Sequence, residues 1–327
     1  MAESFRCDYI VCGAGTAGCL LANRLSADPR RRVLLVEASG NDDYLWIHIP
    51  VGYLYCIGNP RTDWLYRTEP EPGLHGRSLR YPRGKVLGGS SSINGMIYMR
   101  GQRRDYDGWG AGDGHGANPG WGWNECLAYF LRHEDFHGGA SEWHAAPGFD
   151  PAGARAGGEW RVERQRLRWD ILDAFAAAAQ QAGLPAIEDF NRGDNEGVGY
   201  FEVNQRRGVR WNATKAFLRP VLKRPNLQVW TGAHASRVLL EPGTDGRPRA
   251  VGLEVIPVGG GQRLRARVHE LGEVLLSAGA IGSPQLLQLS GIGRAAALQG
   301  HGIDVRAICL APEELRWLDG CPASRFA

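Results

Sequence analysis

The first forty residues carry the pattern that most restricts how this chain can fold. A short apolar run at residues 8–12 ends at Gly13, and residues 16–25 then carry apolar side chains at helical spacing. A second apolar run follows at residues 32–37. Two short apolar runs joined by a helix indicate a βαβ unit whose strands are buried on both faces. We therefore expect an α/β fold built around a parallel sheet.

Three glycines lie at the turn of this unit. Gly13, Gly15 and Gly18 form a G-x-G-x-x-G pattern. The first glycine of such a pattern permits a tight turn, the second lets a pyrophosphate approach the backbone, and the third allows close helix packing. The helix that begins at Thr16 and Ala17 offers its free N–H groups to the anion. The pattern predicts a dinucleotide site, and the alternative is a tight turn that binds nothing.

Glu37, followed by Ala38, closes the second strand about 24 residues after Gly13. Near this spacing, a carboxylate accepts hydrogen bonds from an adenosine ribose. An acidic residue here argues against a 2′-phosphate and hence against NADP, but it leaves NAD and FAD open. The alternative is that Glu37 is only the solvated end of a strand.

Two further turns of small residues lie later in the chain. Residues 83–100 read RGKVLGGSSSINGMIYMR, with four glycines around three serines. Such a loop exposes N–H and hydroxyl groups that can line an extended ligand such as a flavin dinucleotide; the alternative is a plain connector. The apolar run 273–276 leads into Ser277-Ala278-Gly279, and Ser283-Pro284 predicts a helix start with proline in the first turn.

Composition excludes several classes of protein. The 38 basic and 35 acidic residues leave a net charge of +3, so we expect no nucleic-acid partner. The seven cysteines include no C-x-x-C pair, which argues against a disulfide framework and for a reducing cytoplasm. No run of 18 apolar residues occurs, so we expect no transmembrane segment; peripheral attachment to the inner membrane stays open. Only three of the basic residues are lysines, which favours a GC-rich, bacterial source.

Three blocks resemble the glucose-methanol-choline (GMC) oxidoreductases, which are FAD enzymes that act on alcohols. They are the unit at residues 13–37, GKVLGGSSSIN at residues 84–94 and GSPQLLQLSGIG at residues 282–293. The likeness extends over about residues 5–307 and fails in the tail. The resemblance implies a Rossmann-like FAD-binding domain made of residues 1–110 and 200–307. It also implies an incomplete substrate-binding domain with a partial cap segment at 111–199. The tail at 308–327 is unlike the family.

The resemblance also implies which residues bind FAD. These are Gly13, Gly15, Thr16, Ala17, Gly18, Glu37, Ala38, Arg83, Val86, Gly88, Gly89, Ser90, Asn94, Gly95, Met96, Ile97, Ala235, Val238, Ala278 and Gly279. Asn94 matches the position at which some family members attach the flavin covalently through histidine, so non-covalent FAD is implied. Val238 has plain strand packing as its alternative.

The activity implied by the resemblance is oxidation of the CH–OH group of an alcohol, choline or another primary alcohol, by hydride transfer to flavin N5. An electron acceptor such as a quinone would follow. The reaction needs a base near the hydroxyl, and imidazole suits this task. None of the nine histidines matches the catalytic position of the family, so the catalytic residue stays unassigned. An inactive FAD-binding fragment is the first alternative, and we expect a half-core with exposed apolar surface. The oligomeric state stays open.

Residues 133–137 favour a different function. Their sequence is HEDFH, which matches H-E-x-x-H. On a helix, this spacing puts two imidazoles on one face for zinc and a carboxylate nearby as base. A zinc hydrolase and an NAD-dependent dehydrogenase are therefore the alternatives of another class, although we expect no metal site. A helical pattern is also expected at residues 169–181.

Overall fold

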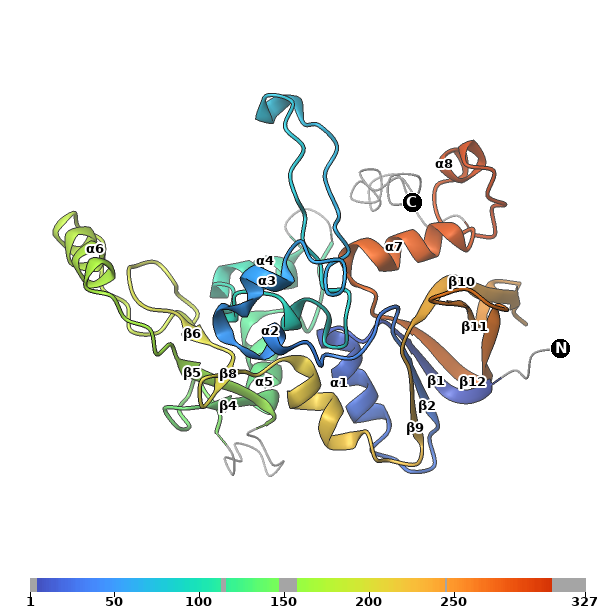
Figure 1. Cartoon of the computed structure of the whole chain (residues 1–327), viewed down its shortest axis with the longest axis horizontal. Coiled ribbons are helices and arrows are strands. Elements are labelled where there is room, and N and C mark those ends of the chain that lie inside the picture. Colours follow the sequence, from blue (N-terminus) through green and yellow to red (C-terminus); the bar gives the residue numbers. More distant parts are fainter. Residues whose placement is uncertain (1–4, 113–115, 147–157, 245, 308–327) are drawn as a thin grey trace. The chain divides into compact units, whose positions relative to one another are not determined.

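The computed structural model describes residues 5–112, 116–146, 158–244 and 246–307. They form two compact units (Figure 1). The described parts of the first unit are residues 5–47, 52–93 and 212–307, and those of the second are residues 48–51 and 94–211, without the gaps. The domain limits expected at residues 110 and 200 lie inside the second unit. The tail 308–327 lies outside the described residues.

A mixed sheet of six strands organises the described part of the first unit. In spatial order its strands are β10 (Ala233–Pro242), β11 (Pro248–Pro257), β12 (Leu264–Leu276), β1 (Phe5–Cys12), β2 (Val33–Val36) and β9 (Leu227–Trp230). The strands from β12 to β9 are parallel, whereas β10, β11 and β12 pair antiparallel. The α/β class with a Rossmann-like parallel core is confirmed.

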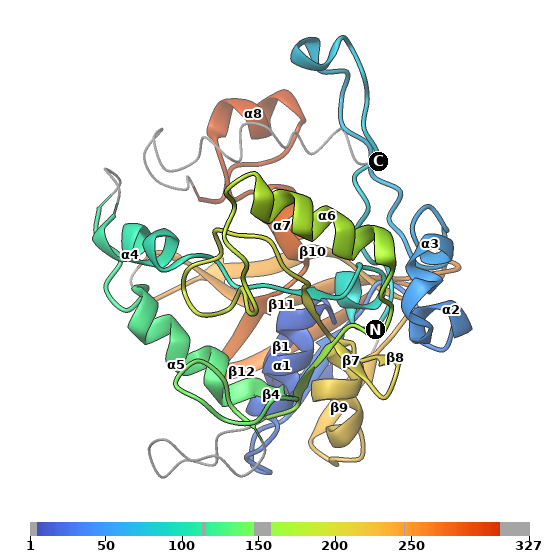
Figure 2. The same ribbon diagram turned by 90° about the vertical axis from the view of Figure 1, so that its left-hand side faces the viewer.

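Helix α1 (Thr16–Leu25) joins β1 to β2 and packs against both strands, as Figures 1 and 2 show. The other helical elements between residues 45 and 92 are α2 (Leu45–His48), η1 (Pro50–Gly52), α3 (Tyr53–Cys56), η2 (Pro72–Leu74) and η3 (Gly89–Ser92). From residue 214 onward they are η4 (Thr214–Leu218), η5 (Arg219–Val221), α7 (Gly279–Leu289) and α8 (Ala295–Gly300).

The start expected for the last long helix at Ser283-Pro284 is wrong. Helix α7 begins at Gly279, and Pro284 lies inside it. The turn of small residues after β12 begins the helix, and the Ser283 hydroxyl oxygen accepts the Ala278 N–H at 3.0 Å. Pro284 lies beyond the first turn of the helix and has no N–H to donate to the carbonyl four residues earlier.

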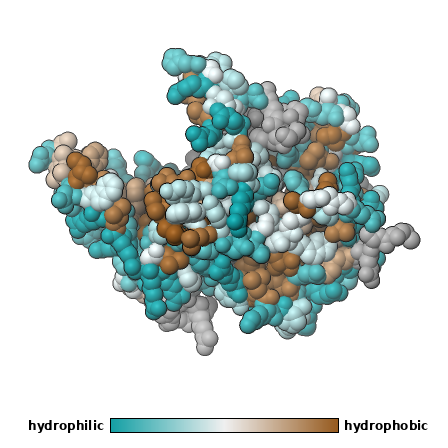
Figure 3. Space-filling model, viewed as in Figure 1, coloured by the Kyte–Doolittle hydropathy of each residue, from teal (hydrophilic) through white to brown (hydrophobic). Residues whose placement is uncertain are grey.

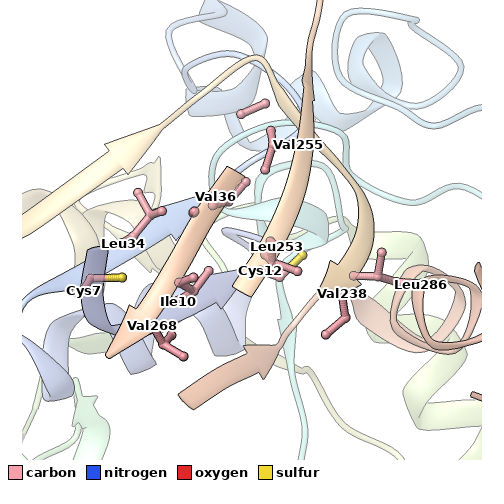
Figure 4. Close-up of a cluster of buried hydrophobic side chains, with 12 residues drawn as sticks. Cys7, Ile10, Cys12, Leu34, Val36, Val238, Leu253, Val255, Val268 and Leu286 are labelled. Carbon is pink, nitrogen blue, oxygen red and sulfur yellow. The ribbon is translucent and has the colours of Figure 1, made fainter. Parts of the chain in front are cut away.

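The core of the six-stranded sheet is apolar (Figure 4). Its buried members are Cys7, Ile10, Cys12, Leu34, Val36, Ala233, Val238, Leu253, Val255, Ala266, Val268 and Leu286. All four residues of β2 are buried, which is the pattern of a parallel strand covered on both faces. Burial raises the pKa of the Cys7 and Cys12 thiols to about 12, so these cysteines are packing residues and not reactive thiols.

The described part of the second unit holds a four-stranded sheet and a two-stranded sheet. The first has the order β3 (Ile97–Tyr98), β6 (Glu202–Val203), β5 (Trp160–Arg164), β4 (Glu134–Phe136), and β7 (Gln205–Arg206) pairs with β8 (Val209–Arg210) in the second. Its helices are α4 (Arg103–Ala111), α5 (Trp123–His133) and α6 (Asp170–Gln181). Helix α6 confirms the helical pattern expected at residues 169–181.

Apolar side chains are exposed on this second unit. On α6, Ile171 is 69% exposed and Phe175 is 68% exposed, and no residue of the helix is buried. Figure 3 shows brown, apolar side chains on this helix. Ile97 on β3 is also exposed. Exposed apolar surface of this kind is what the sequence predicts for a half-core.

In the part of the chain that the structure describes, no helix is both long enough and apolar enough to cross a lipid bilayer.

Candidate cofactor-binding site

The glycine turn between β1 and α1 requires glycine at two of its positions. Gly13 has a φ of +98°, and a Cβ there would lie 2.5 Å from the Ser277 carbonyl oxygen. A Cβ on Gly18 would lie 1.8 Å from the Gly13 carbonyl oxygen. A side chain at either position would therefore force the turn, the helix or the β12–α7 connection apart.

The N-terminus of α1 is open. In the described residues no side chain caps this end, and no acidic residue lies in its first turn. The Cys19 N–H donates to the Gly15 carbonyl oxygen, as in a regular helix. Thr16 and Ala17 are exposed, and a Cβ on Gly15 would meet no atom within 4 Å. Free N–H groups facing open space suit a pyrophosphate.

Glu37 is not a solvated strand end, so that alternative is wrong. Its Oε2 accepts the Ala14 N–H and its Oε1 accepts the Ser39 N–H, both at 3.0 Å, and the residue is 6% exposed. Burial raises the pKa of this carboxyl group, while backbone hydrogen bonds from Ala14, Ser39 and Ala38 and the Lys85 charge act against the rise. Each carboxylate oxygen has a second lone pair, so Glu37 can still accept a ribose hydroxyl.

The second glycine cluster packs on the first, which overturns the interpretation of a loose connector. The Gly88 N–H donates to the Ala14 carbonyl oxygen at 2.7 Å. A Cβ on Gly89 would lie 2.8 Å from Gly15 Cα, and a Cβ on Gly84 would lie 2.2 Å from Gly89 backbone atoms. The two turns, far apart in sequence, therefore form one cradle, which we define as residues 13–18 with 84–92.

The other residues of the 83–93 segment differ in exposure. Ser90 is exposed, and its Oγ accepts the Gly84 N–H at 3.2 Å. Val86 is buried in an apolar cluster with Ile93. The Arg83 guanidinium lies over the Tyr81 ring at 4.2 Å.

The third small-residue turn also meets the first. The Ser277 N–H donates to the Cys12 carbonyl oxygen at 2.7 Å, and a Cβ on Gly13 would come within 2.9 Å of Ala278 Cα. Ala278 and Gly279 are exposed. Gly279 has a φ of +85° with open space around its missing side chain.

Ala235 and Val238 lie on β10 in different surroundings. The Ala233 N–H donates to the Glu37 carbonyl oxygen at 2.9 Å, which sets the start of β10 beside the end of β2. Ala235 is half-buried two residues later. Val238 is buried in the sheet core, and its N–H donates to Ser290 Oγ at 2.8 Å. Val238 thus has the packing role that was its alternative, and contact with an adenine stays a prediction.

Asn94, Gly95, Met96 and Ile97 belong to the second unit. Asn94 Oδ1 accepts the Met96 N–H at 3.1 Å and the Arg210 guanidinium at 2.9 Å. Met96 is buried at a φ of +64°, while its three neighbours are exposed. A non-glycine residue in the left-handed region is uncommon and marks a segment whose shape is imposed by its surroundings.

Three residues near the cradle were not anticipated from the sequence. Lys85 Nζ lies 4.8 Å from the Trp64 ring centroid, and the His234 ring meets Trp64 edge-on at 5.7 Å. Burial lowers the pKa of His234, and the Lys85 charge adds to this effect. The available signal was Lys85 itself, one of three lysines, inside the second glycine cluster.

The zinc hydrolase alternative is wrong, because the H-E-x-x-H residues do not lie on one helix. Helix α5 ends at His133, and Glu134–Phe136 form strand β4. The two histidines therefore do not share a helix face. Among the described residues, no group of three or more His, Cys, Asp or Glu side chains is placed to hold a metal ion.

Comparison with known proteins identifies the family to which this chain is similar. The family model described as GMC oxidoreductase matches residues 7–305. An alcohol dehydrogenase (acceptor) of Pseudomonas putida is 42% identical over 297 residues, which cover 90% of this chain and 50% of the relative. An oxygen-dependent choline dehydrogenase of Photobacterium profundum is 43% identical over 299 residues, which cover 91% of this chain and 49% of the relative.

A solved structure is similar over the same region. The pyridoxine 4-oxidase of Mesorbium loti has a TM-score of 0.82 and 34% sequence identity, covering 92% of this chain and 55% of that one. The chain spans about half the length of the curated relatives it matches. Because the family match extends over residues 7–305 and includes the whole cradle, this chain belongs to the GMC oxidoreductase family.

Proposed function

We propose that this chain is the FAD-binding part of an oxidoreductase that oxidises the CH–OH group of a small alcohol, choline or another primary alcohol. GMC oxidoreductases are flavoproteins that bind FAD. The observation that carries the proposal is the stacking of the Gly88–Gly89 turn on the Gly13–Gly15 turn. It lengthens the cradle beyond the single turn that a dinucleotide-binding βα unit needs, and this length favours FAD over NAD.

The residues present fit the cofactor. The open N–H groups at Thr16 and Ala17 would hold the pyrophosphate, and the Glu37 carboxylate would accept the ribose hydroxyls. A Cβ on Gly15 would meet nothing within 4 Å, so the space beside the Gly15 Cα atom leaves room for the pyrophosphate of the ligand. When bound, FAD supplies the two-electron acceptor for the hydride of the alcohol carbon. The protein's own part is to bind, orient and exclude water.

FAD is proposed to bind without a covalent bond. Asn94 stands where the covalent attachment of some family members uses histidine, and a carboxamide is not a nucleophile that could form that bond. Its side-chain oxygen is already engaged by Met96 and Arg210. Binding should therefore be reversible.

Gly15→Val tests the proposed cofactor site. The purified chain should quench the fluorescence of added FAD with a finite dissociation constant, and an excess of NAD should not displace the flavin. Valine at position 15 has room in the folded chain but fills the ligand space, so it should abolish binding and leave the unfolding free energy within about 1 kcal/mol of the original.

Gly300→Val is the matched control, because a Cβ there also meets nothing within 4 Å. It should bind FAD like the original chain. Unimpaired FAD binding by Gly15→Val, or displacement of the flavin by NAD, would contradict the proposed site.

The electron acceptor is proposed to be a quinone. The Pseudomonas putida relative is named for an acceptor, and the Photobacterium profundum relative is named as oxygen-dependent. Reoxidation of the dithionite-reduced, FAD-loaded chain by a soluble quinone faster than by air would support this assignment.

A further inference from the structure

A cluster of buried polar side chains connects the cradle to segments that are distant in sequence. They are Asp42, Ser91, Ser92, Asn212 and Thr214, and all five residues are buried. Asp42 lies in the loop after β2, the two serines lie in η3, and Thr214 begins η4. Polar groups buried in this way are costly unless each finds a hydrogen-bond partner.

Asp42 is the common acceptor of this cluster. Its Oδ2 accepts from the Thr214 hydroxyl and from the Asn212 side-chain amide, the latter at 3.0 Å. Its Oδ1 accepts from the Arg219 guanidinium at 2.9 Å. One carboxylate therefore binds three donors from the segment 212–219.

Hydrogen bonds of Asn212 and Ser91 connect the 212–214 segment to the second glycine turn. Asn212 Nδ2 also donates to Ser92 Oγ at 2.9 Å, and Ser92 Oγ donates to the Leu87 carbonyl oxygen at 2.8 Å. Ser91 Oγ accepts the Ala213 N–H at 3.0 Å and donates to the Gly88 carbonyl oxygen at 2.6 Å. The carbonyls of Leu87 and Gly88 are thus both held by serines of the next turn, which the 212–214 segment fixes.

Gly88 packs so closely against side chains of this cluster that no side chain would fit at its position. Gly88 has a φ of +88°, and a Cβ there would lie 2.4 Å from Ser92 Oγ, 3.2 Å from Asn212 Nδ2 and 3.3 Å from Thr214 Cγ2. On its other side, the Gly88 N–H bonds the Ala14 carbonyl oxygen. The Gly88 turn is therefore clamped between the 212–214 segment and the first glycine turn.

We propose that Asp42, Asn212 and Thr214 are positioning residues for the cofactor, which hold the Gly88–Ser92 turn in register with the Gly13–Gly15 turn. They act through the backbone of the cradle and not by contact with the ligand. The inference rests on the proposed FAD site. Its physical basis is preorganisation: a cradle held in its binding shape pays no ordering cost when the ligand arrives.

Thr214→Val and Thr214→Ser form the central test. Valine keeps the shape and the methyl group near Gly88 but removes the hydroxyl, which leaves Asp42 short of a buried donor. We expect FAD affinity to fall about tenfold, with broadened visible absorption bands of bound FAD because the flavin is held less rigidly. Serine restores the hydroxyl and should bring affinity back to within about twofold of the original.

Ser26→Ala is the matched control for a merely structural role. Ser26 is also buried, and its Oγ accepts the Arg224 guanidinium at 2.8 Å, but it lies at the far end of α1, about 15 Å from the glycine turn. Its loss should lower the unfolding free energy of the apoprotein and leave FAD affinity unchanged. If Thr214→Val behaves like Ser26→Ala, the positioning role is overturned.

Ser91→Ala gives a second, independent variant should Thr214→Val fold poorly. It removes the bridge between the Ala213 N–H and the Gly88 carbonyl oxygen and should also weaken FAD binding about tenfold. Unchanged affinity in this variant overturns the inference. Absence of FAD binding by the original chain overturns the proposed function and the inference together, whereas normal binding by the original and by Thr214→Val overturns the inference alone.

Discussion

His144 lies between two carboxylates inside the second unit. Its Nδ1 is 3.0 Å from Glu134 Oε2, and its Nε2 is 2.8 Å from Asp189 Oδ2. Glu134 also bonds the buried Arg100 guanidinium at 2.9 Å, and the Phe136 ring stacks on the imidazole at 3.7 Å. At the scale of single residues, this is a buried ionic group that joins three segments of the chain, and no step of the proposed reaction uses it.

The charges around His144 predict a pH-dependent stability. Burial by itself lowers the pKa of His144, but hydrogen bonds to Asp189 and Glu134 outweigh burial, so the pKa is raised above its ordinary value of 6.5. A raised pKa means that the imidazolium stabilises the fold fully below about pH 6.5. This contribution is lost as the pH rises through the folded-state pKa.

His144→Gln should therefore lower the unfolding free energy by about 3 kcal/mol at pH 6, because it breaks a buried ion pair. The difference from the original chain should shrink at pH 9. Urea unfolding at both pH values measures it. The exposed His301 supplies the control, since His301→Gln should change little at either pH, and a difference for His144→Gln that is independent of pH would contradict the assignment.

At the scale of elements, α6 is a helix without a buried face. It has twelve residues and none of them is buried, whereas a surface helix normally buries an apolar stripe. An isolated helix of this length is marginal in water. The capping box of α4, in which Gln102 and Asp105 satisfy each other's backbone groups, shows a helix end stabilised locally; α6 has no side-chain N-cap of this kind.

Phe175→Ser on α6 should cost less than about 1 kcal/mol of unfolding free energy, because the ring is 68% exposed and little apolar area is lost from the core. The same type of change at Phe217, which is 1% exposed, should cost about 3–5 kcal/mol. Urea denaturation compares the two. Phe175→Ser should also reduce binding of a hydrophobic dye, and a large loss of stability at Phe175 would mean that the helix is packed in solution.

At the scale of the whole molecule, we predict that the chain does not oxidise alcohols by itself. It spans about half the length of its curated relatives, and no histidine has been assigned as the base that alcohol oxidation needs. Anaerobic addition of choline and other primary alcohols to the FAD-loaded chain separates the two cases. We expect the flavin absorbance to stay unchanged with this chain alone.

Bleaching of the flavin bands would contradict that expectation and would show that a base and a substrate pocket are present in the chain. Dithionite provides the control, because it should bleach the bound flavin in any case. If dithionite bleaches the flavin and the alcohols do not, the chain is an FAD-binding part without its own alcohol chemistry.

Much of the fold could be predicted from local pattern. The βαβ unit at residues 8–37 follows from side-chain periodicity, and Gly18 is needed because the helix approaches the Gly13 carbonyl oxygen within the same turn. The helix at 169–181 follows from its apolar spacing. These features depend on residues within a few positions of one another, so the chain encodes them wherever it lies in the fold.

The errors came from features that depend on neighbours in space. The H-E-x-x-H match failed because α5 ends at His133, where Glu134 instead enters a strand beside β5. The solvated strand end considered for Glu37 failed because its carboxylate is buried and accepts the Ala14 N–H. The burial of Val238 in the sheet core, which decided for its packing role, likewise depends on residues distant in sequence, such as Cys12 and Leu286.

By itself, the sequence determined the strand–turn–helix–strand unit, the identity of its glycines and the likeness to one family. Only the tertiary structure decided that the two glycine turns stack and that Asp42 anchors them through Thr214, which lies 172 residues away. The physical reason is range: backbone conformation and periodicity act within a turn or two. Hydrogen bonds among Asp42, Ser92 and Asn212 exist only after the whole unit has closed around them.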